Sequence, residues 1–308
     1  MKSSWFKGRK LRAYVVSARV RTLPLSVAGV LLGSLLAAGE GDFKRGVFAW
    51  AVVTTLALQV LANFANEVGD MKKGTDNAQR LGPVRSLQGG ALEARDLVRA
   101  MAVAGGVAVV AGCLLVCEAF AGWLDVRGAI LLLTGGAAIV AAVKYTVGRR
   151  AYGYRGLGDL FVMIFFGWVS VLGSYFAMTG TMAARYLLPA TAIGAFSVMV
   201  LNLNNMRDIQ NDAACGKRTL PVMLGARRAK LYHLGLLLAG VGCLLAWSLS
   251  RQGGGWRDYL FLLALPLLCY HVREVFRRDG RELDGQLRVL SLTTLLVALL
   301  TGAGVLPF

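Results

Sequence analysis

Nine long apolar runs constrain this chain more than any other feature of its sequence. Each run is close to the roughly 20 residues that an α-helix needs to cross a bilayer. They cover approximately residues 22–39, 46–69, 97–118, 128–146, 158–179, 186–205, 229–249, 258–275 and 288–305. Because lipid offers no water to satisfy backbone polar groups, the runs predict an all-α membrane protein, with nine transmembrane helices in a bundle around a central cavity.

The composition excludes an ordinary soluble protein. Of the 308 residues, 56% are hydrophobic and only 17% are charged, and the mean hydropathy is +0.58. No low-complexity linker separates two regions, so residues 1–308 are expected to form a single domain with a basic arm at 1–21. The net charge of +17 does not indicate a nucleic-acid partner, because positive loops facing anionic membrane lipid are its commoner cause in a membrane protein.

Loops rich in lysine and arginine alternate along the chain with loops that hold few of them, so the basic loops fall on one side of the predicted membrane. The basic loops are the arm and the segments 72–99, 144–155, 207–230 and 273–288, whereas the intervening loops hold few basic residues. Since basic loops stay in the cytoplasm, the N-terminus is predicted to be cytoplasmic and the C-terminus to lie outside.

Polar side chains with one shared spacing follow the second and sixth apolar runs. In both stretches, oxygen-bearing residues recur at i, i+3 and i+7, so they lie on one face of a helix. They are Asn63, Asn66 and Asp70 in the first acidic motif (residues 63–76), and Asn205, Asp208 and Asp212 in the second (residues 205–219). Helix ends that turn polar on entering water are the alternative, but two matched copies favour a binding site.

These oxygen-rich motifs suit Mg²⁺, which usually brings substrate phosphates with it. Two acidic helix ends that face each other repel unless cations lie between them, so the motifs predict metal ions that bridge a diphosphate. Nearby basic residues can complete the clamp, although each one alone is equally well explained as a solvated cytoplasmic charge. The candidates are Arg21, Lys72, Arg80, Arg85, Lys144, Lys217 and Arg218.

A third polar stretch, residues 144–159, lies on the same predicted side. Its tyrosines, Tyr145, Tyr152 and Tyr154, can cover a developing cation, or they can form an interfacial belt. Asp159 is either the N-terminal acid of a helix or part of the site. The isolated His233 and His271 are predicted to be structural. A lipid with a diphosphate head and a long apolar tail is the ligand that best fits such a site in a membrane.

Four stretches resemble the UbiA-type intramembrane prenyltransferases, in particular the branch that acts on 1,4-dihydroxy-2-naphthoate. They are Arg21-Thr-Leu-Pro24, Arg80-Leu-Gly-Pro-Val-Arg85, Tyr152 to Asp159 with Phe165-Phe-Gly-Trp168, and Asn204 to Thr219. The likeness covers roughly residues 19 to 225. It implies a Mg²⁺ cofactor and a ligand set of Asn63, Asn66, Glu67, Asp70, Asp76, Asn205, Asp208 and Asp212. Glu67 stands where the family usually has Asp.

The resemblance also implies a reaction. A polyprenyl group would pass from polyprenyl diphosphate to 1,4-dihydroxy-2-naphthoate with loss of CO₂ and diphosphate, giving demethylmenaquinol for menaquinone biosynthesis at the bacterial cytoplasmic (inner) membrane. The candidate catalytic residues are Asp70, Asp208, Lys144 and Tyr145. The candidate substrate-binding residues are Asn63, Arg21, Lys72, Arg80, Arg85, Arg149, Tyr152, Tyr154, Asp159, Lys217 and Arg218, with Lys144 and Arg149 the first choices for the acceptor carboxylate.

Three alternatives stay open at this point. A sister enzyme of the family would act on 4-hydroxybenzoate, homogentisate or haem. A transporter would bind an ion or anionic substrate, but its polar helix breaks should lie near mid-membrane rather than beside basic loops. A CDP-alcohol phosphotransferase-like enzyme would also use metal and aspartates, but its Asp-Gly-x-x-Ala-Arg run is absent from the sequence.

Overall fold

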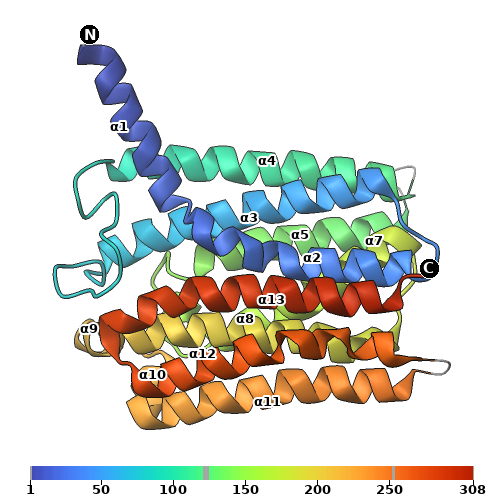
Figure 1. Cartoon of the computed structure of the whole chain (residues 1–308). Coiled ribbons are helices and arrows are strands. Elements are labelled where there is room, and N and C mark those ends of the chain that lie inside the picture. Colours follow the sequence, from blue (N-terminus) through green and yellow to red (C-terminus); the bar gives the residue numbers. More distant parts are fainter. Residues whose placement is uncertain (1, 121–124, 252–253, 308) are drawn as a thin grey trace.

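The computed structural model describes residues 2–120, 125–251 and 254–307, and nearly all of its regular structure is helical (Figure 1). Within these ranges nine helical segments are long and apolar enough to cross a bilayer, which confirms the predicted fold class. The segments are Lys10–Ala38, Arg45–Lys72, Ala94–Phe120, Val126–Lys144, Gly158–Thr179, Ala184–Arg207, Ala226–Ser250, Trp256–Arg277 and Gly280–Val305. The side of the membrane on which the N-terminus lies stays a prediction.

The first span differs from its predicted start at residue 22. Helix α1 (Lys2–Ser17) already contributes to it from Lys10, because residues 11–18 are mostly apolar. Arg19 then adopts a left-handed backbone conformation with φ of 52°, and the short helix η1 (Val20–Thr22) leads into α2 (Leu23–Ala38). This bend turns α1 away from the bundle in Figure 1.

The remaining long helices run roughly along one common axis in Figure 1. They are α3 (Arg45–Lys72), α4 (Ala94–Phe120), α5 (Val126–Lys144), α7 (Ser170–Thr179), α8 (Leu187–Arg207), α11 (Ala226–Ser250), α12 (Leu265–Arg277) and α13 (Asp284–Val305). The loop after α3 and the short helices α9 (Ile209–Ala214) and α10 (Leu220–Leu224) lie at the same end of the bundle. Both acidic motifs are therefore at one end.

Buried apolar side chains hold the bundle together in separate clusters. The largest joins α8 to α11, α12 and α13 through residues such as Phe196, Leu244 and Leu290. A second packs α2 against α7 and α8, around Leu32, Met178 and Ile193. Neither cluster fills the space between α3, α5 and the fifth span, and this space is the cavity described below.

The fifth span is interrupted by a π-helical segment. Between α6 (Gly158–Val162) and α7, the segment η3 (Met163–Val169) has π-helical hydrogen bonding. Such segments are frequent at functional sites. Here η3 packs closely on α8, where a Cβ atom on Gly167 would come within 2.7 Å of the Cα of Gly194. This contact leaves the opposite side of the segment free to line the cavity.

Candidate active site

A cavity of about 480 Å³ lies between α2, α3, α4, α5, the fifth span and α8. Its polar end contains side chains of both acidic motifs together with basic residues. These are Arg19, Arg21, Asn63, Asn66, Asp70, Arg80, Arg85, Asp208, Asp212 and Lys217. Its other end is lined mainly by small and apolar residues of α3, α4, α5 and α7, among them Ala51, Val116, Leu131 and Ala177. The cavity can therefore hold an anionic head at one end and an apolar tail at the other.

Lys217 connects the two acidic motifs. Its Nζ lies 3.7 Å from Oδ2 of Asp70 and 3.7 Å from Oδ1 of Asp212. All three side chains are buried, with exposed fractions of 7%, 6% and 3%. Since a buried cation between two carboxylates satisfies charge that would otherwise repel, the motifs form one site.

Two arginines of the loop between α3 and α4 make a second connection. Arg80 Nε lies 3.1 Å from Oδ1 of Asp76, and its Nη2 lies 3.8 Å from Oδ2 of Asp208. Arg85 Nε lies 3.7 Å from Oδ1 of Asp76. The backbone N–H of Leu81 also donates to Oδ1 of Asp208 at 3.0 Å. This loop therefore covers the acidic end of the cavity.

Burial makes the charged form of some of these carboxylates less stable. It raises the pKa of Asp76, and it raises that of Asp212 to about 6 despite the opposing effect of Lys217. Burial also acts on Asp208, but the hydrogen bond and charge of Arg207 outweigh it and lower the pKa of that carboxyl. The site therefore favours an added cation near Asp76 and Asp212 more than near Asp208.

The donor atoms fit Mg²⁺ better than a soft metal. Several buried oxygens have neither a hydrogen bond nor an ion pair, namely Oδ2 of Asp76, Oε2 of Glu67 and Oδ1 of Asn205. Across the described ranges, no three carboxylates, thiols or imidazoles converge as a group that could hold a metal by themselves. Mg²⁺ commonly takes one or two carboxylates and completes its shell with water and substrate phosphate, so this arrangement suits a cation that arrives with a diphosphate.

The predicted tyrosines divide into two groups. Tyr154 donates from its hydroxyl to Oδ1 of Asp70 at 2.8 Å and orients that carboxylate. Tyr145 and Tyr152 line the cavity, where the ring of Tyr152 stacks on Phe161 with centroids 3.9 Å apart. Burial raises the pKa of Tyr145 to about 12, so its phenol stays protonated at neutral pH.

Several predicted residues lie outside the cavity lining. Four basic ones are exposed: Lys72 and Lys144 at the last residue of a helix, and Arg149 and Arg218 in segments between helices. Asp159 accepts a hydrogen bond from the Tyr232 hydroxyl at 3.0 Å. Glu67 accepts one from the backbone N–H of Leu87 at 2.9 Å and so holds the loop after α3. Arg21, by contrast, does line the cavity, and its guanidinium also pairs with Asp284 at 2.8 Å.

Arg19 is a cavity residue that the sequence patterns did not single out. Among the described residues it is the one non-glycine with positive φ, a conformation that costs roughly 1–2 kcal/mol. Its guanidinium donates to Oδ1 of Asn66, and its buried Nε has no hydrogen-bond partner. In the part of the chain that the structure describes, no carboxylate lies within ion-pair distance of it. Arg19 is therefore available to bind an anion.

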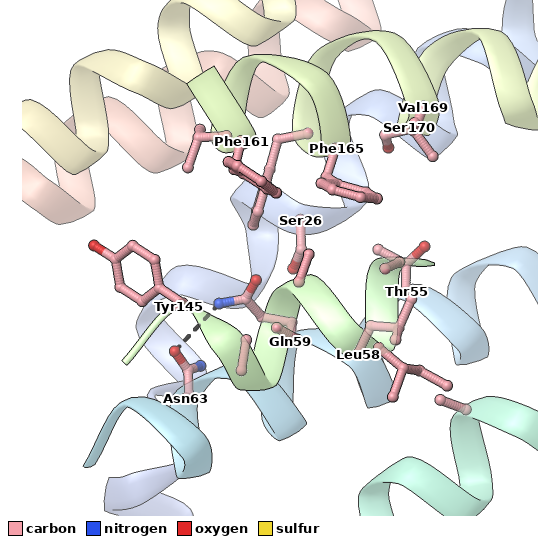
Figure 2. Close-up of a pocket in the computed structure, with 18 of the residues that line it drawn as sticks. Ser26, Thr55, Leu58, Gln59, Asn63, Tyr145, Phe161, Phe165, Val169 and Ser170 are labelled. Carbon is pink, nitrogen blue, oxygen red and sulfur yellow. Dashed lines mark hydrogen bonds between the residues drawn. The ribbon is translucent and has the colours of Figure 1, made fainter. Parts of the chain in front are cut away.

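Gln59 extends the polar face of the first acidic motif one turn deeper. Its Nε2 donates to Oδ1 of Asn63 at 3.3 Å, and Figure 2 shows both amides beside Tyr145, opposite Phe161 and Phe165. The spacing of four residues from Asn63 is the signal that could have revealed it. Gln59 places a polar group where the cavity becomes aromatic and apolar.

Comparison with known proteins gives consistent matches. Residues 26–295 match the model of the UbiA prenyltransferase family. The chain is 41% identical over 268 residues to 1,4-dihydroxy-2-naphthoate octaprenyltransferase of Escherichia coli K12, covering 87% of this chain and 86% of the relative. The protein of the same name from Haemophilus influenzae is 39% identical over 309 residues and is covered to 99%, as is this chain.

Solved structures show the same fold at lower identity. The apo structure of a UbiA homologue from Aeropyrum pernix K1 superposes with a TM-score of 0.67 at 19% identity, covering 93% of this chain and 97% of that one. A UbiA homologue from Archaeoglobus fulgidus bound to DMAPP and Mg²⁺ gives a TM-score of 0.58 at 15% identity, with 93% and 98% covered.

Proposed function

Because the chain belongs to the UbiA prenyltransferase family, we propose that it transfers a polyprenyl group from polyprenyl diphosphate to 1,4-dihydroxy-2-naphthoate. The observation that carries this proposal is the cavity. Side chains of both acidic motifs and several basic side chains line one end of it, and the rest of its wall is mainly apolar. The names of the bacterial relatives support the naphthoate acceptor. A transporter is disfavoured because both motifs lie at helix ends.

The diphosphate head of the donor would bind at the polar end. Arg80, Arg85 and Lys217 would contact its oxygens, and Asp70, Asp76, Asp208 and Asp212 would hold Mg²⁺ there. When bound, Mg²⁺ supplies Lewis-acid stabilisation for the negative charge that builds up on the departing diphosphate. The related structure bound to DMAPP and Mg²⁺ supports the choice of a prenyl diphosphate and Mg²⁺ as ligands. The prenyl tail would extend between α3, α4, α5 and α7.

The acceptor would bind between the polar end of the cavity and its apolar end. Phe161, Phe165 and Tyr145 offer aromatic faces to the naphthalene ring, and Gln59 can accept a hydrogen bond from a ring hydroxyl. We assign the acceptor carboxylate to Arg19, because this guanidinium lines the cavity without a carboxylate partner. Lys144 and Arg149, the first choices from the sequence, are exposed outside the lining.

The reaction then needs little acid–base chemistry from the protein. The allylic C–O bond breaks and its electron pair leaves with the diphosphate, so an allylic cation remains in a cavity from which apolar walls exclude water. The electron-rich ring forms the new C–C bond at the carbon that carries the carboxylate. Loss of the carboxylate as CO₂ returns its electron pair to the ring and gives demethylmenaquinol. Tyr145 and Phe161 would stabilise the cation through their ring faces.

The membrane assignment also follows from the charge pattern. The nine candidate spans among the described residues and the match to the UbiA family support a multi-pass membrane protein. We propose that it resides in the bacterial cytoplasmic membrane with the polar end of the cavity on the cytoplasmic side, since the basic loops gather at that end.

An assay in isolated membranes tests the proposed function directly. Membranes containing the protein are incubated with 1,4-dihydroxy-2-naphthoate and polyprenyl diphosphates, with and without EDTA, and products are identified by mass. The expected product is a decarboxylated prenyl naphthoquinol that EDTA abolishes. Products formed only from 4-hydroxybenzoate or homogentisate would instead identify a sister enzyme of the family.

A further inference from the structure

Four buried polar side chains form a continuous row across the C-terminal half of the bundle, outside the cavity lining. They are Asn202 on α8, His233 on α11, His271 on α12 and Gln286 on α13, with exposed fractions of 0%, 0%, 0% and 3%. The proposed reaction uses none of them. This polar row is costly to bury unless every hydrogen bond is made, so its geometry needs an explanation.

The hydrogen bonds of the polar row run in one direction. Asn202 Nδ2 lies 3.3 Å from His233 Nδ1, His233 Nε2 lies 2.9 Å from His271 Nε2, and His271 Nδ1 lies 3.0 Å from Gln286 Oε1. An amide nitrogen only donates, so His233 accepts at Nδ1 and donates from Nε2. His271 then accepts at Nε2 and donates from Nδ1 to Gln286. One neutral tautomer of each ring satisfies both histidines, whereas Oδ1 of Asn202 is left without a hydrogen-bond partner.

Such a row fixes how the four helices are placed along their axes. Lipid is as apolar as the helix surfaces, so the hydrophobic effect does not by itself set the register of helices in a membrane. A shift of one residue moves a side chain by about 1.5 Å along the axis and would break these hydrogen bonds. Asn202 also donates to the carbonyl of Ala229 at 3.1 Å, which ties α8 to the start of α11.

The two ends of the polar row lie on the helices that carry charged groups of the site. Gln286 is two residues after Asp284, and Asn202 is five residues before Arg207. Arg207 is 1% exposed, and its Nη1 lies 2.6 Å from Oδ1 of Asp284 while its Nη2 lies 2.6 Å from Oδ2 of Asp208. The register of α13 against α8 therefore decides whether Asp284 meets Arg207.

We propose that the polar row positions the second acidic motif: it holds α13 against α8, and thereby holds Arg207 between Asp284 and Asp208. The four side chains are positioning residues, because they act through Arg207 and do not line the cavity. This inference rests on the proposed role of Asp208 in binding the diphosphate with Mg²⁺. It assigns a function to the two histidines that the sequence left as structural.

The first test replaces the whole polar row by apolar residues of similar size, Asn202→Leu, His233→Leu, His271→Leu and Gln286→Leu together. Replacing all partners at once leaves no orphaned group, so the thermal unfolding temperature should stay near that of the unaltered protein. Mg²⁺-dependent binding of geranyl thiolodiphosphate, a slowly reacting donor analogue, is measured by calorimetry and should weaken about tenfold. Unchanged binding in this stable variant would overturn the proposal.

A matched control lies on α13, the helix that carries Gln286. Thr294 is buried on α13 but donates only within its helix, to the carbonyl of Leu290 at 2.9 Å. Thr294→Val should therefore leave analogue binding unchanged. The conservative variant His271→Gln keeps one donor and one acceptor and should recover most of the binding that His271→Leu loses.

A double-mutant cycle keeps the proposal testable if the fourfold variant does not fold. His271→Leu and Asp284→Asn are made singly and together, and analogue binding is compared. If the polar row acts through Asp284 and Arg207, the two losses are strongly non-additive; independent, additive losses contradict it. If the unaltered protein itself shows no Mg²⁺-dependent analogue binding, the proposed function fails, and this outcome is distinct from failure of the positioning role.

Discussion

The two acidic motifs reach one cavity but are neutralised differently. Asp70 of the first motif is paired with Lys217, which belongs to the second motif and lies 3.7 Å away. Asp208 of the second motif is paired with its own neighbour Arg207 at 2.6 Å, and that arginine is fixed again by Asp284. Asp70 is thus paired only across the two motifs, whereas Asp208 is held by an adjacent arginine that a third helix also fixes, and we expect the partner of Asp70 to be the one that substrate and metal replace.

The largest expected effect comes from removing the carboxylate of Asp70. Asp70→Ala should lower prenyl transfer by at least about 100-fold, because it removes a proposed ligand of the Mg²⁺ that would stabilise the departing diphosphate. The unfolding temperature should fall less than in the Asp208 variant, since Lys217 keeps Asp212 as a partner and the Tyr154 hydroxyl keeps that of Thr75. Turnover in membranes and the thermal unfolding temperature in detergent measure the two effects. Near-normal turnover would refute the role of Asp70.

The matching change at Asp208 should affect stability as well as activity. Asp208→Ala removes one of the two carboxylates around a buried arginine and a hydrogen-bond acceptor for the Leu81 N–H. We expect a large loss of turnover together with a destabilisation of about 1–3 kcal/mol, seen as a lower unfolding temperature. Equal unfolding temperatures for the Asp70 and Asp208 variants would remove the distinction between the motifs.

A smaller and more selective effect is expected at the anion-binding residue beside the first motif. Arg19→Gln should raise KM for 1,4-dihydroxy-2-naphthoate about tenfold, since a charged hydrogen bond contributes roughly 1.5–3 kcal/mol. KM for the polyprenyl diphosphate should change much less. Steady-state kinetics with each substrate varied in turn decide this. A rise confined to the donor would reassign Arg19 to the diphosphate.

The smallest effects are expected at the exposed basic residues outside the cavity. Lys144→Ala and Arg149→Ala should change turnover by less than about twofold, because a solvated charge contributes little. Both variants are assayed beside Arg19→Gln under the same conditions. A loss larger than that of the Arg19 variant would return the acceptor carboxylate to the loop after α5.

The membrane fold could be predicted from the sequence because it depends on quantities that are local along the chain. Run length and apolar composition define a span, so the sequence predicts each of the nine spans found in the described ranges, except for the earlier start of the first at Lys10. The spacing of Asn63, Asn66 and Asp70, repeated at Asn205, Asp208 and Asp212, likewise needs only helix geometry to predict a shared face.

The placement of single charges was decided by the tertiary structure. Lys144 and Lys217 both look like basic loop residues in the sequence, yet the first is exposed and the second lies buried between two motifs. Arg19 lines the cavity with its own backbone in the left-handed conformation. His233 on α11 forms a hydrogen bond with His271 on α12. The spans and acidic faces follow from sequence-local periodicity, whereas which cation meets which carboxylate depends on side chains far apart in the chain packing around one cavity.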